Sequence, residues 1–437
     1  MGYSRRPLST TAETLLALTA CGVLIARPWI ALGAVPPFAL WLVSTSGGRQ
    51  TLAMTRIGLA TVPQRLGATS VVVVGIAGVV GVLVALLAMA QGFESTLKSA
   101  GNEQTAIVLR AGANSELSSG LDRTAAVLIA QAPGVRRDAR DVPVASAEVV
   151  VVSNVPKRST GTDANVEVRG VGPQTWKLRP EVRIIRGRRF EPGMRELIVG
   201  QGALAQFRGL EPGSIVQLNG QAWKVTGVFA SGDSHESEIW GDAESVAAAY
   251  RRNGFQSVSV RLRDAGAFDT LETSLTGDPR LRVDVLTTRD YYSKQSERLT
   301  TVIRAIGFGV AVIMALGAVF GALNTMYAAV AARAREIATL RALGFTALPV
   351  VVSVMLETML LALVGGVVGA GIAWAAFNGY TVSTLGANFS QIVFRFQVSP
   401  ELLLRGLQWA LAIGFTGGLF PALRASRLPV TQALREL

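Results

Sequence analysis

Long apolar runs are the dominant pattern along this chain. Four of them are long enough to cross a bilayer core of about 30 Å as helices, namely Gly67–Gln91, Thr301–Ala332, Leu348–Phe377 and Leu402–Phe420. Helices satisfy their own backbone hydrogen bonds in lipid, so the pattern predicts an α-helical transmembrane bundle with four core spans. Pro421 follows the fourth run and is expected to end that helix.

Residues 93–298 separate the first two spans and contain no run of membrane length. Helical and strand-like periodicities alternate in this segment, which predicts an inserted α+β domain, in two lobes joined near Asp264–Asp269. Asn219-Gly220 lies between two strand-like runs and is typical of a two-residue hairpin turn. The expected helices are Gly120–Ala132 and Ala243–Asn253, and the expected strands are Val142–Asn154, Val166–Gly170, Gly213–Leu218, Trp223–Phe229, Ser257–Leu262 and Leu281–Leu286. The segment Asn378–Ser399, between the third and fourth spans, is expected to be a loop.

Residues 1–47 form a hydrophobic extension whose course the pattern leaves open. The runs Thr14–Ile25 and Ile30–Val43 are each short for a span, and Pro36-Pro37 breaks the second. Two spans, one kinked span and a re-entrant hairpin all fit, and a membrane hairpin is the preferred interpretation. Cys21, the single cysteine, follows Leu-Thr-Ala as in a lipoprotein cleavage box, but the apolar residues after it argue against lipidation.

Positive charge gathers beside the apolar runs. Residues 93–298 hold 27 Lys and Arg against 25 Asp and Glu, whereas the rest of the chain holds 15 against 5. Positive flanks keep loops in the cytoplasm, so this distribution predicts membrane topology rather than nucleic-acid binding. Residues 48–66, with arginines among apolar positions, are expected to form an interfacial helix, so that 48–92 comprises this helix and the first core span.

A basic connector, residues 333–345, joins the second and third spans. It carries Arg333, Arg335 and Arg341 beside the single acid Glu336, so it is expected on the cytoplasmic side, with residues 93–298 outside. Apolar residues recur in it at helical spacing, and Gly344 offers a stop, which predicts a short amphipathic helix on the inner membrane face. On this topology the tail 424–437 is also cytoplasmic.

Two kinds of residue inside the spans are candidates for a function. Glu357 falls about 13 Å into the third span, a depth at which a carboxyl usually faces protein or water. The alternative is a structural glutamate that is protonated or hydrogen-bonded. Small residues let helices approach closely, so the spans' regularly spaced glycines are candidate packing positions, namely Gly75, Gly78, Gly81, Gly317, Gly321, Gly365 and Gly369.

Three parts of the chain resemble the MacB/FtsX-type family of ABC transporter permeases. VAARAREIATLRALGFTALPVVVSVMLETMLLALVGGVVG is similar to the family's coupling helix and third span, although Ala338 and Phe345 replace common Gly and Ala. GLFPALRASRLPVTQALREL resembles the family's C-terminal end, with Pro429 and Val430 as departures. In the inserted domain, family pieces occur in order at Gly170–Pro173, Gly187–Phe190, Val199–Ala205, Gly213–Gly220 and Val225–Val228. Residues 1–47 are not covered.

The resemblance implies a non-catalytic permease subunit of the bacterial inner membrane with a MacB-like periplasmic core domain, and residues 299–437 as its last three spans. It implies a cytoplasmic ABC ATPase dimer that binds ATP and Mg, with no cofactor in this chain, and contact with that ATPase by Arg333, Arg335, Glu336, Arg341 and Gly344. A second permease copy, identical or related, is a further expected partner, as are membrane lipids and a periplasmic adaptor. Motion would pass to the outer domain by mechanotransmission.

The sequence lacks the residues for its own nucleotide or hydrolytic chemistry. It contains no Gly-Lys dipeptide and hence no phosphate-cradling loop. With His235 as the only histidine and Cys21, in an apolar run, as the only cysteine, no Ser/His/Asp or Cys/His set is expected. Asp233, Glu236, Glu238 and Asp242 surround it, which could indicate a metal site; a solvated polar loop is the preferred interpretation, and no metal is expected.

Three functions remain open at this point. The first is ATP-driven export or extraction of lipids, lipoproteins, peptides or small toxic molecules. The second is an FtsX-like signalling permease that regulates envelope hydrolases and moves no substrate. The third is a membrane-anchored binding protein without an ATPase. The sequence does not name a cargo, and an outer-membrane partner is not decided by it.

Overall fold

The structure is a computed structural model that describes residues 28–264, 266–385 and 390–427. Its elements fall into two compact units. We call one the helical unit (Met1–Met89, Ile303–Gly379 and Gln397–Leu437) and the other the inserted domain (Ala90–Val302 and Tyr380–Phe396). The predicted run Thr14–Ile25, with Cys21, lies outside the described residues.

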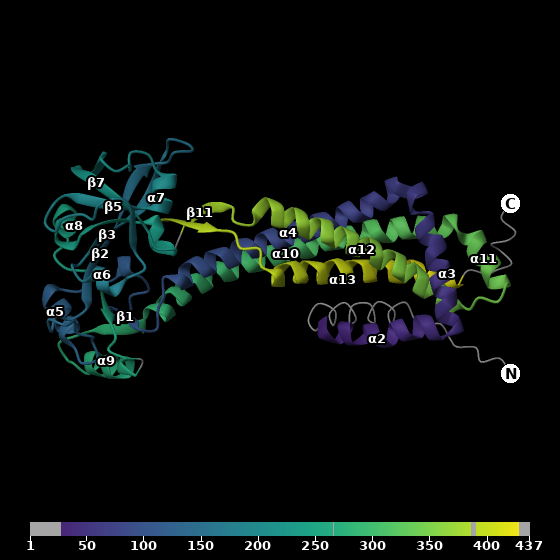
Figure 1. Cartoon of the computed structure of the whole chain (residues 1–437), viewed down its shortest axis with the longest axis horizontal. Coiled ribbons are helices and arrows are strands. Elements are labelled where there is room, and N and C mark those ends of the chain that lie inside the picture. Colours follow the sequence, from purple (N-terminus) through teal and green to yellow (C-terminus); the bar gives the residue numbers. More distant parts are fainter. Residues whose placement is uncertain (1–27, 265, 386–389, 428–437) are drawn as a thin grey trace. The chain divides into compact units, whose positions relative to one another are not determined.

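The helical unit contains the four predicted spans. The described helices long and apolar enough to cross a membrane are Thr69–Ser99, Thr288–Ala332, Ala347–Phe377 and Pro400–Arg427. They belong to α4 (Leu66–Ser99), α10 (Thr288–Ala332), α12 (Ala347–Phe377) and α13 (Pro400–Arg427). Before them come α2 (Pro28–Ser44), α3 (Ser46–Ala60) and the 3₁₀ turn η1 (Val62–Arg65), and α11 (Ala334–Ala342) lies between the second and third spans. α12 and α13 run side by side (Figure 1).

Two predicted helix breaks are wrong. α2 continues through Pro36 and Pro37, and α13 continues through Pro421 to Arg427. Pro421 is buried, with Gly417 and Gly418 one turn before it packed against neighbouring helices. Favourable close packing here outweighs a cost of about 3 kcal/mol for proline inside a helix.

A ten-stranded mixed sheet forms the centre of the inserted domain. Its strands run in the order β10-β1-β9-β2-β3-β8-β5-β7-β4, with β6 paired to β7. The strands are β1 (Thr105–Arg110), β2 (Ala145–Pro156), β3 (Asp163–Val171), β4 (Arg183–Gly187), β5 (Glu196–Gly200), β6 (Ile215–Leu218), β7 (Gln221–Ala230), β8 (Ile239–Asp242), β9 (Ser257–Arg261) and β10 (Val283–Thr287). The predicted hairpin turn is confirmed: Asn219 and Gly220 have φ of 48° and 72° between β6 and β7.

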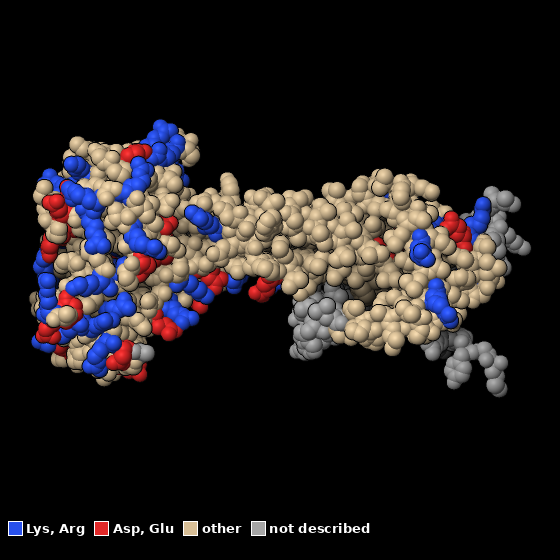
Figure 2. All heavy atoms as spheres, viewed as in Figure 1, with Lys and Arg blue, Asp and Glu red and all other residues tan. Residues whose placement is uncertain are grey.

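Short helices and turns surround this sheet. They are η2 (Glu116–Ser118), α5 (Arg123–Gln131), α6 (Thr175–Leu178), α7 (Gln201–Gln206), η3 (Ser234–Ser237), α8 (Ala243–Ala249) and α9 (Ala267–Thr276). Two large buried aromatic side chains, Trp223 and Trp240, belong to separate apolar clusters of the domain. On the face shown in Figure 2, charges of both signs cover the inserted domain, and a group of charges of the helical unit is visible near α3 and α11.

Two further expectations for this region are wrong. The segment expected to be a loop forms an antiparallel hairpin, β11 (Thr381–Leu385) and β12 (Gln391–Arg395), which belongs to the inserted domain. Phe394, 2% exposed, holds it there by an edge-to-face contact with Phe93. The domain also does not divide into two lobes near Asp264–Asp269, because β9 and β10, on either side of that segment, both pair with β1.

Candidate functional site

The connector between the second and third spans forms helix α11, and Arg333 lies at its start. Arg333 occupies the N-cap position, between the end of α10 and Ala334. Its Nη1 donates to Glu357 Oε2 at 3.3 Å, and its Nε donates to Glu336 Oε2 at 3.3 Å. The Arg333 side chain is 15% exposed, so it is directed largely into the helical unit. The predicted ATPase-coupling residue thus binds an acid of the third span.

Glu357 of α12 receives a second arginine from another segment. Arg65, at the end of η1, donates from Nη2 to Glu357 Oε1 at 3.0 Å. The Glu357 side chain is 6% exposed, and a buried carboxylate is costly unless charged donors satisfy it. Gly58 of α3 makes room for the group, since a Cβ there would lie 2.8 Å from Glu357 Oε2. We call Arg65, Arg333 and Glu357 the inner ion group; it joins η1, α12 and the α10–α11 junction.

The outer face of α11 carries the remaining predicted coupling residues. Arg335 and Glu336 are exposed and Arg341 is half-buried, while Ile337 is buried in an apolar cluster with Met54 of α3. Gly344, with φ of +101°, follows the helix end in a conformation that favours glycine. Leu343 differs from the amphipathic pattern because it lies beyond the last helical residue and is 74% exposed. The contact of these residues with an ATPase stays a prediction.

The glycines predicted to pack helices have different surroundings. A Cβ at Gly365 would lie 2.9 Å from Val73 O, and one at Gly369 would overlap Ala77 O, so α12 lies directly against α4 at both positions. Gly81 approaches the carbonyl oxygen of Gly369, and Gly78 approaches Met314. A Cβ added at Gly75, Gly317 or Gly321 would meet no atom of a neighbouring described element within 4 Å. Close helix contacts that the pattern missed occur at Gly366, Gly406, Gly414, Gly417 and Gly418.

A buried ionic cluster lies inside the inserted domain, with Arg169 of β3 at its centre. The Arg169 side chain is 2% exposed and binds four carboxylates. Its Nε donates to Glu238 (2.8 Å), Nη1 donates to Glu116 (2.8 Å) and Glu148 (2.9 Å), and Nη2 donates to Glu167 (2.9 Å). We call these five residues the Arg169 cluster. Guanidinium geometry suits such shared, directional binding.

Electrostatic attraction in the Arg169 cluster outweighs the cost of burial. Burial would raise the pKa of Glu148, but Arg179 and Arg169 lower it to about 2. Arg179, which follows α6, binds Glu148 Oε1 at 2.5 Å. Burial would likewise raise the pKa of Glu238, but Arg169 and His235 lower it. Both carboxylates therefore stay ionised near neutral pH.

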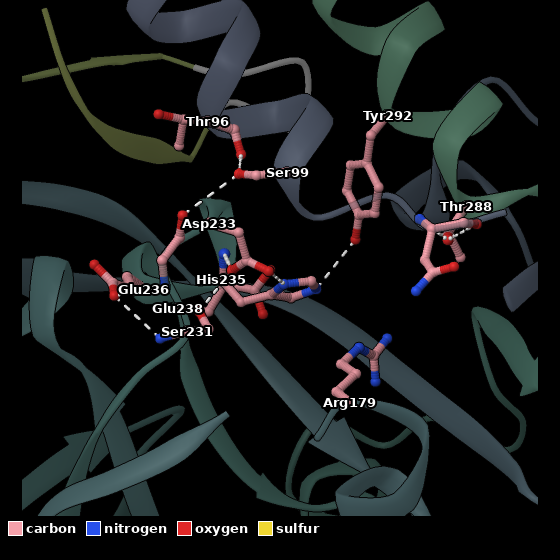
Figure 3. Close-up of polar contacts among 12 residues, drawn as sticks. Thr96, Ser99, Arg179, Ser231, Asp233, His235, Glu236, Glu238, Thr288 and Tyr292 are labelled. Atoms are coloured by element: carbon pink, nitrogen blue, oxygen red, sulfur yellow. Dashed lines mark hydrogen bonds and ion pairs between the residues drawn. The ribbon is translucent and has the colours of Figure 1, made fainter. Parts of the chain in front are cut away.

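His235 lies beside this cluster, so its predicted place in a solvated loop is wrong. It belongs to η3 and is 1% exposed. Its Nδ1 lies 3.0 Å from Asp233 Oδ2, and its Nε2 lies 3.1 Å from the hydroxyl of Tyr292 on α10 (Figure 3). Among the described residues, no group of three His, Cys, Asp or Glu could hold a metal ion.

The sequence contained a usable signal for this cluster. Glu148 directly precedes the buried run Val149–Val151 of β2, and Glu167 and Arg169 alternate with buried Val166, Val168 and Gly170 in β3. A charged side chain at such a position needs a buried partner of opposite charge. The partners Glu116 and Glu238 come from turns far away in the sequence, so the pattern could indicate a buried ion pair but not its members.

Known protein families match both units of the chain. Residues 69–277 match the family model of the MacB-like periplasmic core domain, and residues 308–430 match that of the FtsX-like permease C-terminal region. The chain is 25% identical over 426 residues to the macrolide export ATP-binding/permease protein MacB of Bdellovibrio bacteriovorus, covering 89% of this chain and 61% of that protein. It is 25% identical over 235 residues to the uncharacterized ABC transporter permease YknZ of Bacillus subtilis, covering 51% and 56%.

The chain thus spans less than two thirds of the length of both relatives. Among solved structures, the periplasmic region of MacB from Actinobacillus actinomycetemcomitans is similar with a TM-score of 0.33 and 14% identity, over 44% of this chain and 92% of that chain. The extracellular domain of YknZ gives a TM-score of 0.32 and 18% identity, over 42% and 100%.

Proposed function

Because the chain belongs to the MacB/FtsX-type family of ABC transporter permeases, we propose that it is the membrane subunit of an ATP-driven export or extraction system. It is a multi-pass inner-membrane protein whose inserted domain is periplasmic. A permease of this class works with an ABC ATPase and as a dimer. We infer that the ATPase is a separate cytoplasmic chain which binds ATP and Mg, and that α11 is the surface on which it docks.

The single observation that carries this proposal is the inner ion group. Arg333 belongs to the connector that a cytoplasmic ATPase could reach, and it binds Glu357 of the third span directly. A displacement of α11 would therefore pull on α12 through a charged contact rather than slide past it. Exposed Leu343, at the C-terminal end of the helix whose first turn carries exposed Arg335 and Glu336, offers the ATPase an apolar contact.

From α12 the displacement would pass to the other spans by close packing. α12 lies against α4 at Gly365 and Gly369, and against α13 at Gly414 and Gly418. α4 and α10 each continue as one helix into the inserted domain. We infer that the periplasmic domain moves substrate by this mechanical route. The cargo classes are lipids, lipoproteins, peptides or small toxic molecules.

The docking role is tested by co-purifying the chain with its partner proteins. Glu336→Lys combined with Arg341→Glu should abolish ATPase co-purification, because it reverses two charges on α11, while membrane insertion stays intact. Arg405→Glu, on α13, is the control and should retain the partner. A stoichiometric ATPase in the double variant would contradict docking on α11.

A second experiment separates export from signalling. ATPase activity of the complex in liposomes should rise when a cargo of the listed classes is added, because transport couples cargo to hydrolysis. An ATPase that ignores every such cargo, together with activation of an envelope hydrolase, would instead indicate the signalling permease. Absence of any co-purifying ATPase would indicate the membrane-anchored binding protein.

A further inference from the structure

The turn η3, with the residues just before it, is held by all three segments that link the inserted domain to the helical unit. From the end of α4, Ser99 Oγ, which donates to Thr96 O at 2.9 Å, lies 3.4 Å from Gly232 O. From the start of α10, the Tyr292 hydroxyl lies 3.1 Å from His235 Nε2. From the β11–β12 hairpin, Val393 N donates to Ser237 Oγ at 2.8 Å. Figure 3 shows the first two contacts converging on this turn.

The same turn is fixed to the sheet. Glu238 O accepts from Gly200 N, at the end of β5, at 2.9 Å, and the Glu238 carboxylate binds Arg169 of β3. The turn also holds its own shape, since Glu236 Oε1 accepts from the backbone N of Ser231 and Gly232 at 3.0 and 2.8 Å. A displacement of η3 is therefore passed to β3, β5 and β8, because these hydrogen bonds limit deformation within the turn itself.

Charged and titratable groups face His235 from every element around it. They are Asp233 from its own segment, Glu238 before β8, Arg179 after α6 and Tyr292 from α10, with the Trp240 ring edge-on at 5.6 Å. Together with the Arg169 cluster, these described residues include five carboxylates and two guanidiniums. A positive charge on His235 offsets part of this excess of negative charge among buried side chains.

We propose that charged His235 is a positioning residue, which fixes Tyr292 to η3 so that movement of α10 is transmitted to the sheet. The inference rests on the proposed function and locates the transmission step within the periplasmic domain. In the charged form, Nδ1–H donates to Asp233 and Nε2–H donates to the Tyr292 hydroxyl. A charge-assisted bond of this kind is roughly twice as strong as a neutral one.

Loss of the proton would weaken this contact. Nε2 would then become an acceptor, and Tyr292 would have to turn its own hydrogen toward it. Burial raises the pKa of Tyr292 well above its ordinary value of 10, so its hydroxyl keeps that hydrogen. Burial would lower the pKa of His235, but Asp233 and Glu238 raise it above its ordinary 6.5. The stabilisation that charged His235 contributes is therefore fully present below pH 6.5, and it is lost as the pH rises through the raised pKa of His235.

The protonation state can be measured directly, because the sequence has one histidine. The full chain, labelled with ¹⁵N in the histidine ring and carrying a histidine-free tag, is titrated by NMR in lipid nanodiscs. We expect a midpoint above 6.5, and a lower midpoint in Asp233→Asn, which removes the facing charge. A wild-type midpoint at or below 6.5 would overturn the charged form.

Transmission is measured in the complex with its ATPase, as the change in amide exchange caused by a non-hydrolysable ATP analogue. In the wild type we expect changes in residues 288–302 and in residues 231–242. Tyr292→Phe and His235→Gln should keep the nucleotide-dependent change in amide exchange in residues 288–302 and lose the change in residues 231–242. Tyr291→Phe is the matched control: it removes the neighbouring hydroxyl, which accepts from Glu116 N, and should behave as wild type.

The pH profile separates this role from a structural one. Above the NMR midpoint, the wild type should lose the change in residues 231–242, whereas His235→Gln should show the same exchange pattern on both sides of it. A wild-type complex without any nucleotide-dependent change would contradict the proposed function itself. If Tyr292→Phe retained the change in amide exchange in residues 231–242, or if Tyr291→Phe lost it to the same extent, the role of His235 would be overturned. Neither result would contradict the proposed function.

Discussion

Replacing Arg169 by methionine tests whether the Arg169 cluster stabilises the inserted domain. The substitution keeps an unbranched apolar side chain but removes the guanidinium from Glu116, Glu167 and Glu238, while Glu148 keeps Arg179. The three carboxylates then keep neutral donors, namely Ser257 Oγ, Ser390 Oγ and Trp240 Nε1. Removing one partner of a buried ion pair costs about 3–5 kcal/mol, because the other charge stays buried and unpaired. This is a large fraction of a typical domain stability of about 5–15 kcal/mol, so the variant should unfold at a clearly lower urea concentration than the wild type.

The pH dependence of this cost has a definite sign. In the wild type, the lowered pKa values of Glu148 and Glu238 contribute stability above the ordinary 4.5, which is lost as the pH falls through the folded-state values. In Arg169→Met, carboxylates without a cation would take up protons more readily in the folded state, so the variant gains stability on acidification. The difference in the free energy of unfolding between wild type and Arg169→Met should therefore become smaller as the pH is lowered from neutral to about pH 5.

The measurement is pulse proteolysis in urea on the full chain in nanodiscs, which follows cleavage of the inserted domain. Arg123→Met is the matched control, because Arg123 makes two short contacts with Glu244 at the surface, where both side chains are more than half exposed. Exposed pairs contribute little, so the control should unfold with the wild type. The reasoning would be refuted if Arg169→Met and Arg123→Met had equal free energies of unfolding. It would also be refuted if the difference between Arg169→Met and the wild type did not become smaller in acid.

The remaining predictions concern the helical unit. Gly369→Leu should block assembly of the spans, because any Cβ there overlaps Ala77 O, whereas Gly317→Leu should be tolerated by the isolated chain; detergent-resistant folding on gel filtration distinguishes them. Glu357→Gln should speed amide exchange in η1 and α11, while Glu336→Gln, at an exposed position, should leave η1 unchanged. Met326→Leu, at a buried position, conserves volume and should cost less than about 1.5 kcal/mol in a thermal scan.

The spans could be read from the sequence because lipid imposes a length and a composition on them. Their ends could not. α4 extends to Ser99 and α10 begins at Thr288, well beyond the apolar runs, since residues such as Phe93 and Tyr292 are buried in the inserted domain. Helix continuation there depends on tertiary contacts that a local pattern does not contain.

The candidate functional residues, like the spans, could be predicted from the sequence only in part. The short pattern around Arg333 and Glu336 predicted α11, and the depth of Glu357 marked it as unusual, but only the fold brings Arg65 to it across 292 residues. The polar residues around His235 are typical of a solvated loop by composition. They are buried because α10 and the β11–β12 hairpin, both remote in sequence, cover them.

The proposed transmission path contains two kinds of contact, non-directional packing and directional ion pairs, and they have different roles. Close packing along α12 stabilises the spans through many weak van der Waals contacts, none of which by itself fixes the angle between two groups. Guanidinium–carboxylate contacts do fix orientation, and in each unit they occur where a helix meets another element: Arg333 at the start of α11, Arg169 beside η3. Under the proposed function, variants of these charges should uncouple the two units without unfolding the spans, and volume-conserving apolar changes should not.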